Sequence, residues 1–212
     1  MNGNILSGYS LESGARRLGG HEKMGRSAVV KSSETIYRGK RITVTKDIVV
    51  QPNGETTMRE VVKFANAAAC VPLTKKREVV LIRQFRYPAG GYLYEIPAGI
   101  LASGEKPAQC AAREVEEETG FRARKLTLIG KIHTSPGVCT EVIYLFLAED
   151  LEKSVQNLES GEDIKPHKFA LNKTLQMITD GKITDAKTIC ALFLVQKALA
   201  RRRKDVTHTH TR

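Results

Sequence analysis

The chain has 212 residues, of which 41% are hydrophobic and 27% charged, so it is long enough for one sizeable domain with additional segments. This composition excludes fibrous and wholly disordered classes. The longest apolar stretches, such as residues 67–73, fall far short of the roughly 20 residues that span a bilayer, and no membrane segment is expected. No apolar region follows the first basic residues, so we expect a cytoplasmic protein.

The net charge of +11 is concentrated at the two ends of the chain. Residues 1–33 contain five basic and two acidic residues, and residues 200–212 contain five basic and one acidic residue. Such ends are usually solvated tails, and an anionic partner is the alternative. Because the tails lack interleaved aromatic residues, nucleic-acid binding is not expected. The four widely spaced cysteines indicate neither a zinc site nor a disulfide framework.

The chain divides into four expected segments. Residues 1–33 are rich in Gly, Ser and Arg and are expected to lack fixed structure. Residues 34–64 are expected to form an N-terminal β subdomain, with strands over 42–50 and 60–64 joined by a turn at 51–54. Residues 65–200 are expected to form the main domain, and residues 201–212 a basic tail.

Within the main domain, short apolar runs alternate with turn residues and give way to helical periodicity near the end. Strands are predicted over residues 67–72, 78–83, 92–96, 125–133 and 141–147, and helices over 107–119, 174–179 and 186–203. Several strands with one central helix and C-terminal helices predict an α/β (α+β) sandwich.

The central predicted helix has two chemically different sides. Pro107 suits its first position and Gly120 the residue just past its end. One stripe holds small or apolar residues, namely Ala108, Ala111, Ala112, Val115 and Thr119. The other stripe gathers Glu114, Glu117 and Glu118. One side is therefore expected to pack, and the other to present carboxylates.

Carboxylates three and four positions apart on a helix repel each other by a few tenths of a kcal/mol per pair. A hard divalent cation among their oxygens removes this cost, and Mg²⁺ and Mn²⁺ both prefer oxygen ligands. Arg113 can hold a carboxylate through two hydrogen bonds and fix its orientation. Glu116 points elsewhere and is interpreted as a solvated surface charge.

The spacing around the helix favours a metal site over a solvated acidic surface. From Gly99 the chain has five residues, Glu105, seven residues, and then residues 113–121, which read Arg-Glu-Val-Glu-Glu-Glu-Thr-Gly-Phe. This agrees with the Nudix box at every fixed and apolar position, and the chance of such agreement is on the order of 10⁻⁷ from residue frequencies. The chain therefore resembles the Nudix hydrolase family.

Other segments resemble the ADP-ribose pyrophosphatase branch of that family. They are residues 83–88, residues 95–99 and residues 135–137, and Pro136 stands 16 residues after Gly120, as in ADP-ribose-type members. The resemblance, which covers residues 34–200, implies a Nudix-type α/β/α sandwich with a mixed sheet. It also implies a homodimer in which the N-terminal hairpin subdomain helps to build the partner's nucleotide site.

The resemblance implies the following metal ligands. Glu114 and Glu118 are direct ligands, with the carbonyl of Ala98 as a further one and Glu117 aiding a second ion, and Arg113 belongs to the catalytic set. The cofactor is expected to be Mg²⁺, with Mn²⁺ possible.

Substrate contacts are implied in the same way. Arg86 is expected to bind the diphosphate and Arg59 to lie near the nucleotide, with a surface or strand-pairing role as the alternative for both arginines. Ala98, Ile100 and Pro136 are further predicted substrate contacts. Glu95 either contacts metal or caps its strand.

Hydrolysis also requires a general base that takes a proton from the attacking water. The related enzymes supply it from a mobile loop outside the box, and the matching loop here is residues 157–164. Glu162, which precedes the apolar start of the next strand, is the predicted base, and Glu159 and Asp163 are alternatives.

The resulting expectation is Mg²⁺-dependent hydrolysis of a nucleoside diphosphate sugar, in which ADP-ribose and water give AMP and ribose 5-phosphate. Another nucleotide sugar, such as a GDP- or UDP-sugar, is the alternative substrate. A nucleotide-sugar sensor usually lacks box carboxylates, and all are present here. Removal of a diphosphate from an RNA 5′ end is the alternative that the basic ends suggest.

Overall fold

The computed structural model describes residues 27–209, with side chains through Arg202. These residues form two compact units, each described by itself. One contains residues 67–132 together with 143–209, and the other contains the described residues up to 66 together with 133–142. The expectations for residues 1–26 and 210–212 lie outside the described residues.

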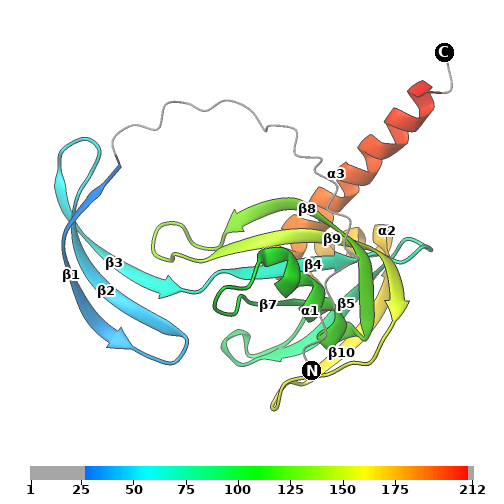
Figure 1. Ribbon diagram of the computed structural model, residues 1–212, viewed down its shortest axis with the longest axis horizontal. Coiled ribbons are helices and arrows are strands. Elements are labelled where there is room, and N and C mark those ends of the chain that lie inside the picture. The colour runs from blue at the N-terminus through cyan, green and yellow to red at the C-terminus, as the bar shows by residue number, and fades with distance from the viewer. Residues whose placement is uncertain (1–26, 210–212) are drawn as a thin grey trace, which may run out of the picture. The chain divides into compact units, whose positions relative to one another are not determined.

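The smaller unit contains an antiparallel sheet of three strands in the order β1-β2-β3 (Figure 1). They are β1 (Val29–Arg38), β2 (Ile42–Val50) and β3 (Thr56–Phe64). The predicted hairpin is confirmed, because β2 and β3 pair from Ile42 opposite Phe64 to Val50 opposite Thr56.

Two boundary predictions for this unit were wrong. Residues 29–33 are part of β1, with Val29 opposite Val50, although they were expected to lack fixed structure. All ten residues of β1 are exposed, so the strand has no buried face that a sequence pattern could report. Residues 133–142, expected in the main domain, belong to this unit: the amide of Val62 donates to the carbonyl of Val138 (2.7 Å), and Thr140 donates to Val62 (3.1 Å).

The larger unit contains two sheets. The mixed sheet has the order β7-β4-β9-β8, in which β4 runs parallel to β9 and antiparallel to β7. Its strands are β4 (Ala67–Pro72), β7 (Ala98–Ile100), β8 (Phe121–His133) and β9 (Val142–Lys153). The second sheet is antiparallel, in the order β10-β5-β6. Its strands are β5 (Glu78–Arg86), β6 (Gly91–Glu95) and β10 (Ile164–Ala170), with a 3₁₀ turn, η1 (Tyr87–Ala89), between β5 and β6.

Helices cover both sides of the mixed sheet, as the alternation along β4 shows. Ala68 and Cys70 pack in the core that includes α1 (Pro107–Thr119). Ala69 and Val71 face the opposite core, with α2 (Leu171–Thr179) and α3 (Ala186–Thr209). Since successive strand residues point to opposite faces, a strand between two helical layers is buried along its whole length, as β4 is. The predicted α/β/α sandwich is confirmed.

The last helix extends beyond its predicted end. It continues through Thr209, so the expected tail at residues 201–212 is helical over most of its length, and Arg202 pairs with Glu149 at 2.7 Å. Arginine and lysine are good helix formers, which favours this continuation. Phe193 on this helix is exposed, and Val195 and Leu199 are among its residues that fill the core. None of the helices within residues 27–209 has the length and apolar character needed to cross a membrane.

Candidate active site

The acidic helix α1 begins at Pro107 and ends before Gly120, as predicted. The amide of Lys106 donates to the side-chain oxygen of Gln109 (3.0 Å) at its N-terminal end. Gly120 has a left-handed backbone (φ 69°), and its amide donates to the carbonyl of Glu116 at 2.9 Å. A glycine reaches this conformation without the strain that a Cβ imposes, so it ends the helix.

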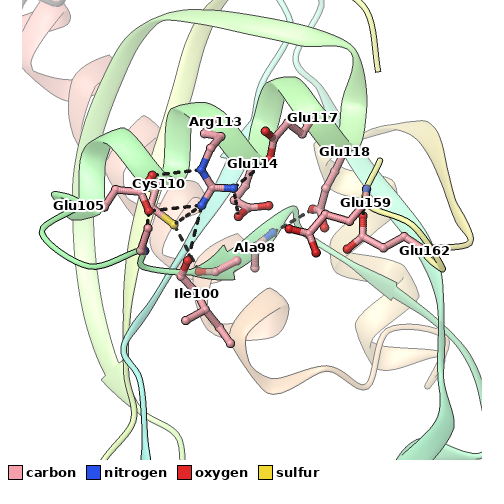
Figure 2. Close-up of polar contacts among 12 residues, drawn as sticks. Ala98, Ile100, Glu105, Cys110, Arg113, Glu114, Glu117, Glu118, Glu159 and Glu162 are labelled. Atoms are coloured by element: carbon pink, nitrogen blue, oxygen red, sulfur yellow. Dashed lines mark hydrogen bonds and ion pairs between the residues drawn. The ribbon is translucent and has the colours of Figure 1, made fainter. Parts of the chain in front are cut away.

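Glu118 is the most deeply buried carboxylate of the helix, with 3% of the residue exposed. It accepts a hydrogen bond from the amide of Ala98 (3.0 Å), which links α1 to β7 (Figure 2). Burial raises the pKa of Glu118 to about 9, and the charges of Glu114 and Glu162 act in the same direction. The charge of Arg86 opposes this shift without offsetting it.

Glu114 lies against the backbone of β7. A Cβ placed on Gly99 would be 1.8 Å from Oε1 of Glu114, so only a glycine allows this approach. The thiol of Cys110, buried on α1, donates to the carbonyl of Gly99 (3.4 Å) and fixes the strand to the helix. Burial raises the pKa of Glu114 to about 6 although Arg113 opposes the shift, and Glu117 and Glu162 add to it.

Arg113 holds three carboxylates in one cluster (Figure 2). Its Nε and Nη2 donate to the two oxygens of Glu105 (3.0 and 3.3 Å), and its Nη1 contacts Glu114 (2.6 Å) and Glu117 (2.9 Å). Nη2 also lies 3.5 Å from the carbonyl of Ile100. Arg113 thus orients several carboxylates, where the sequence predicted one. Glu105, to which the sequence analysis assigned no role, holds the guanidinium of Arg113 in place.

Glu116, interpreted as a solvated surface charge, is partly exposed and has two side-chain partners. Its carboxylate accepts hydrogen bonds from Arg122 (2.7 Å from Nη2) and from the hydroxyl of Ser154 (2.6 Å). The pKa of Glu116 is lowered by these two bonds. Both partners lie outside α1, so no helical periodicity could reveal them.

The loop that carries the predicted base is anchored to the C-terminal end of α1. The amide of Asn157 donates to the carbonyl of Glu117 (2.9 Å), and the amide of Ser154 donates to that of Gly120 (2.8 Å). The side-chain nitrogen of Gln156 donates to the carbonyls of Glu118 (2.8 Å) and Ile164 (3.4 Å). Carbonyls at a helix end need such partners, and here they fix both ends of the loop beside the acidic helix.

Glu162 and its two alternatives have different surroundings in this loop. Glu162 accepts a hydrogen bond from the amide of Glu159 (3.0 Å), and its charge raises the pKa of both Glu114 and Glu118. Figure 2 shows Glu159 and Glu162 on the side of the site where Glu118 lies. Asp163 is bound by the hydroxyl of Tyr92.

Arg86 forms a two-point ion pair with Glu95. Its Nε and Nη2 donate to the two carboxylate oxygens at 2.8 and 2.9 Å, and Lys187 contacts the same carboxylate. Glu95 is therefore bound by two cations. Arg86 is nevertheless close enough to Glu118 for each charge to shift the pKa of the other residue.

Arg59 and Pro136, the two remaining predicted substrate contacts, lie in the smaller unit. The guanidinium of Arg59 binds Thr57 Oγ1 (2.9 Å) and the carbonyl of Met58 (3.2 Å). Pro136 lies in a turn in which the amides of Val138 and Cys139 donate to the carbonyl of Ser135 (3.0 and 2.8 Å).

The residues of α1 and β7 fit a hard divalent cation. Carboxylates and a backbone carbonyl are the oxygen ligands that Mg²⁺ prefers. A cation bound between Glu114 and Glu118 would oppose the burial that raises their pKa values. Among residues 27–202, no three acidic, histidine or cysteine side chains already converge as ligands.

A family model described as the NUDIX domain matches residues 63–192, more than half of the chain. The chain belongs to the Nudix family. Within that family it is 38% identical to the ADP-ribose pyrophosphatase of Bacillus subtilis (strain 168) over 167 residues, which cover 78% of this chain and 90% of the relative. The Nudix hydrolase prediction made from the box is confirmed.

Two other relatives have different names. The GDP-mannose pyrophosphatase of Escherichia coli (strain K12) is 36% identical over 148 residues, covering 65% of this chain and 77% of the relative. The methanol dehydrogenase activator of Bacillus methanolicus is 35% identical over 166 residues, covering 77% and 90%. A solved structure described as an ADP compounds hydrolase matches this chain with a TM-score of 0.76 and 24% sequence identity. The match covers 85% of this chain and 98% of the chain in that structure. This likeness shows the Nudix fold.

Proposed function

We propose that this Nudix hydrolase cleaves the diphosphate of a nucleoside diphosphate sugar, with ADP-ribose as its preferred substrate and Mg²⁺ as its cofactor. The observation that carries the proposal is the pair formed by the buried Glu118 and the partly buried Glu114, whose pKa values are raised beside the close approach at Gly99. The similarity to the ADP-ribose pyrophosphatase of Bacillus subtilis supports the substrate.

The proposed reaction adds one water to ADP-ribose. The water oxygen forms a bond to one phosphorus, the phosphoanhydride P–O bond breaks, and the products are AMP and ribose 5-phosphate. Glu114, Glu118 and the carbonyl of Ala98 are the proposed metal ligands, with Glu117 beside a second ion. Bound Mg²⁺ or Mn²⁺ supplies charge neutralisation on the phosphoryl oxygens and lowers the pKa of a bound water.

The protein side chains supply orientation and proton transfer. Arg113 keeps Glu114 and Glu117 in place, and Glu162 is the proposed base because its charge already acts on Glu114 and Glu118. Within residues 27–202, no group accepts a hydrogen bond from Nη1 of Arg86, so this atom has its donors available for the diphosphate.

Nucleotide recognition is proposed to involve the smaller unit and a homodimer. Arg59 and Pro136 are the proposed substrate contacts of the smaller unit, and Ala98 and Ile100 are the proposed contacts that the larger unit makes by itself. The sheet of the smaller unit exposes apolar side chains on β1, including Val30, Ile36 and Tyr37. Exposed apolar side chains on a sheet support association with a second copy.

A GDP-sugar is the second candidate substrate, because of the similarity to GDP-mannose pyrophosphatase. The two candidates are separated by measuring kcat/KM for ADP-ribose, GDP-mannose and a UDP-sugar with purified protein and Mg²⁺. The proposal predicts the highest kcat/KM for ADP-ribose. A higher kcat/KM for GDP-mannose would reassign the substrate. If micromolar enzyme hydrolysed none of the three nucleotide sugars, the proposed function would be refuted.

A further inference from the structure

We propose that Lys187, in the first turn of α3, is a positioning residue that holds Glu95 and through it fixes Arg86 for the substrate diphosphate. The inference rests on the proposed function, in which Arg86 binds that diphosphate. It adds to the site a helix that lies outside the Nudix box and 92 positions away from Glu95 in the sequence.

Glu95 is the centre of this arrangement, with 1% of the residue exposed. Its Oε1 accepts from Nε of Arg86 (2.8 Å), and its Oε2 accepts from Nη2 of Arg86 (2.9 Å) and from the ammonium group of Lys187. Burial acts to raise the pKa of Glu95, but Arg86 and Lys187 outweigh it, and the pKa is lowered. The carboxylate therefore stays ionised and keeps both bonds to Arg86.

The backbone around Lys187 is held in register with Glu95. The hydroxyl of Thr188 accepts a hydrogen bond from the amide of Ile96 (2.9 Å), so consecutive residues of α3 contact consecutive residues of the chain at the end of β6. Asp185 accepts from the amide (2.9 Å) and the hydroxyl (2.5 Å) of Thr188. Its other oxygen lies 3.1 Å from the ammonium group of Lys187.

The two cations differ in where they point. The side chain of Lys187 is 12% exposed and that of Arg86 is 38% exposed, so Lys187 is the inner cation and Arg86 the outer one. The pKa of Arg86 also responds to the charge of Glu118, which places its guanidinium close to the proposed metal ligands. Without Lys187, Oε2 of the buried Glu95 loses one of its two donors, and of these two cations only Arg86, which must also bind the diphosphate, still holds the carboxylate.

The test is a double-mutant cycle on the full-length protein, with steady-state hydrolysis of ADP-ribose in Mg²⁺ as the readout. The variants are K187M, R86A and the R86A/K187M double variant. K187R provides the conservative rescue, and K197M is the matched control because Lys197 is an exposed lysine of the same helix. Melting temperatures are recorded for every variant, and K187Q, which keeps a polar side chain, replaces K187M if that variant does not fold.

The positioning role predicts that K187M raises KM about tenfold while kcat changes less than twofold, which is the pattern of lost substrate binding. K187R is expected to have a KM within about threefold of the wild-type value. K197M is expected to have the wild-type KM. In the R86A background, K187M is expected to change KM less than twofold, because the residue acts through Arg86.

Equal effects of K187M in both backgrounds, or a fall in kcat with KM unchanged, would overturn the positioning role while the proposed function stands. A wild-type protein that hydrolyses no nucleoside diphosphate sugar would refute the proposed function and the inference with it.

Discussion

Replacing Gly99 by alanine tests whether the position of Glu114 matters for catalysis, because the change should displace this carboxylate without unfolding the protein. The added Cβ would lie 1.8 Å from Oε1 of Glu114, whereas an ordinary contact is at least 3.4 Å, so the carboxylate must retreat by about 1.6 Å. The atoms that move are the end of a side chain, so the free energy of unfolding should fall by about 1 kcal/mol, the low end of the usual cost of overpacking. Displacing a group at the reacting centre by about 1 Å costs on the order of 10²-fold in rate, or about 2.7 kcal/mol.

The G99A variant is therefore expected to keep its melting temperature within a few degrees of wild type and to lose about 10²-fold in kcat/KM for ADP-ribose. The Mg²⁺ concentration for half-maximal activity is expected to rise. G91A is the matched control, because a Cβ on Gly91 of β6 meets nothing within 4 Å. Wild-type kcat/KM and Mg²⁺ dependence in G99A would refute the assignment of Glu114 as a ligand.

Further predictions concern the carboxylates around the site. E118Q should lower kcat by at least about 10²-fold, and E116Q should stay within about threefold of wild type; equal losses would remove Glu118 from the metal site. E162Q should lower kcat with little change in KM, whereas a larger loss in E159Q or D163N would move the base to that residue. In the folded, metal-free protein the pKa of Glu118 is about 9. Between about pH 5 and 9, Glu118 is therefore protonated in the folded protein and ionised in the unfolded chain. The free energy of unfolding should therefore fall as pH rises, by up to about 1.4 kcal/mol per unit, and a flat profile in chemical denaturation would contradict this. E118Q should flatten the profile.

Local signals in the sequence were sufficient for the catalytic helix. Pro107 and Gly120 mark its ends, the 3.6-residue period separates its buried and acidic sides, and the spacing from Gly99 identifies the box. These signals depend on residues within about one helix length of each other. They therefore gave the helix, its family and the group of carboxylates that includes Glu114 and Glu118.

Features that depend on distant partners were not predictable in the same way. Every residue of β1 is exposed, so the strand has no amphipathic pattern in its sequence. The strand forms because β2 supplies its hydrogen-bond partners. The contact between Lys187 and Glu95 joins residues 92 positions apart, and no local sequence pattern connects the two. The proximity of Gly99 to Glu114 follows from how β7 packs on α1, which spacing alone does not specify.

The central claim is that the carboxylates of α1 hold the divalent cation that hydrolysis of a nucleotide sugar requires. The most direct test is quantification of AMP released from ADP-ribose by wild type and by the E114Q/E118Q variant, each with Mg²⁺ and with EDTA. Wild type should release AMP with Mg²⁺ and none with EDTA, and the folded variant should lose at least about 10³-fold in rate with Mg²⁺. Metal-independent release by wild type, or undiminished release by the variant, would contradict the account.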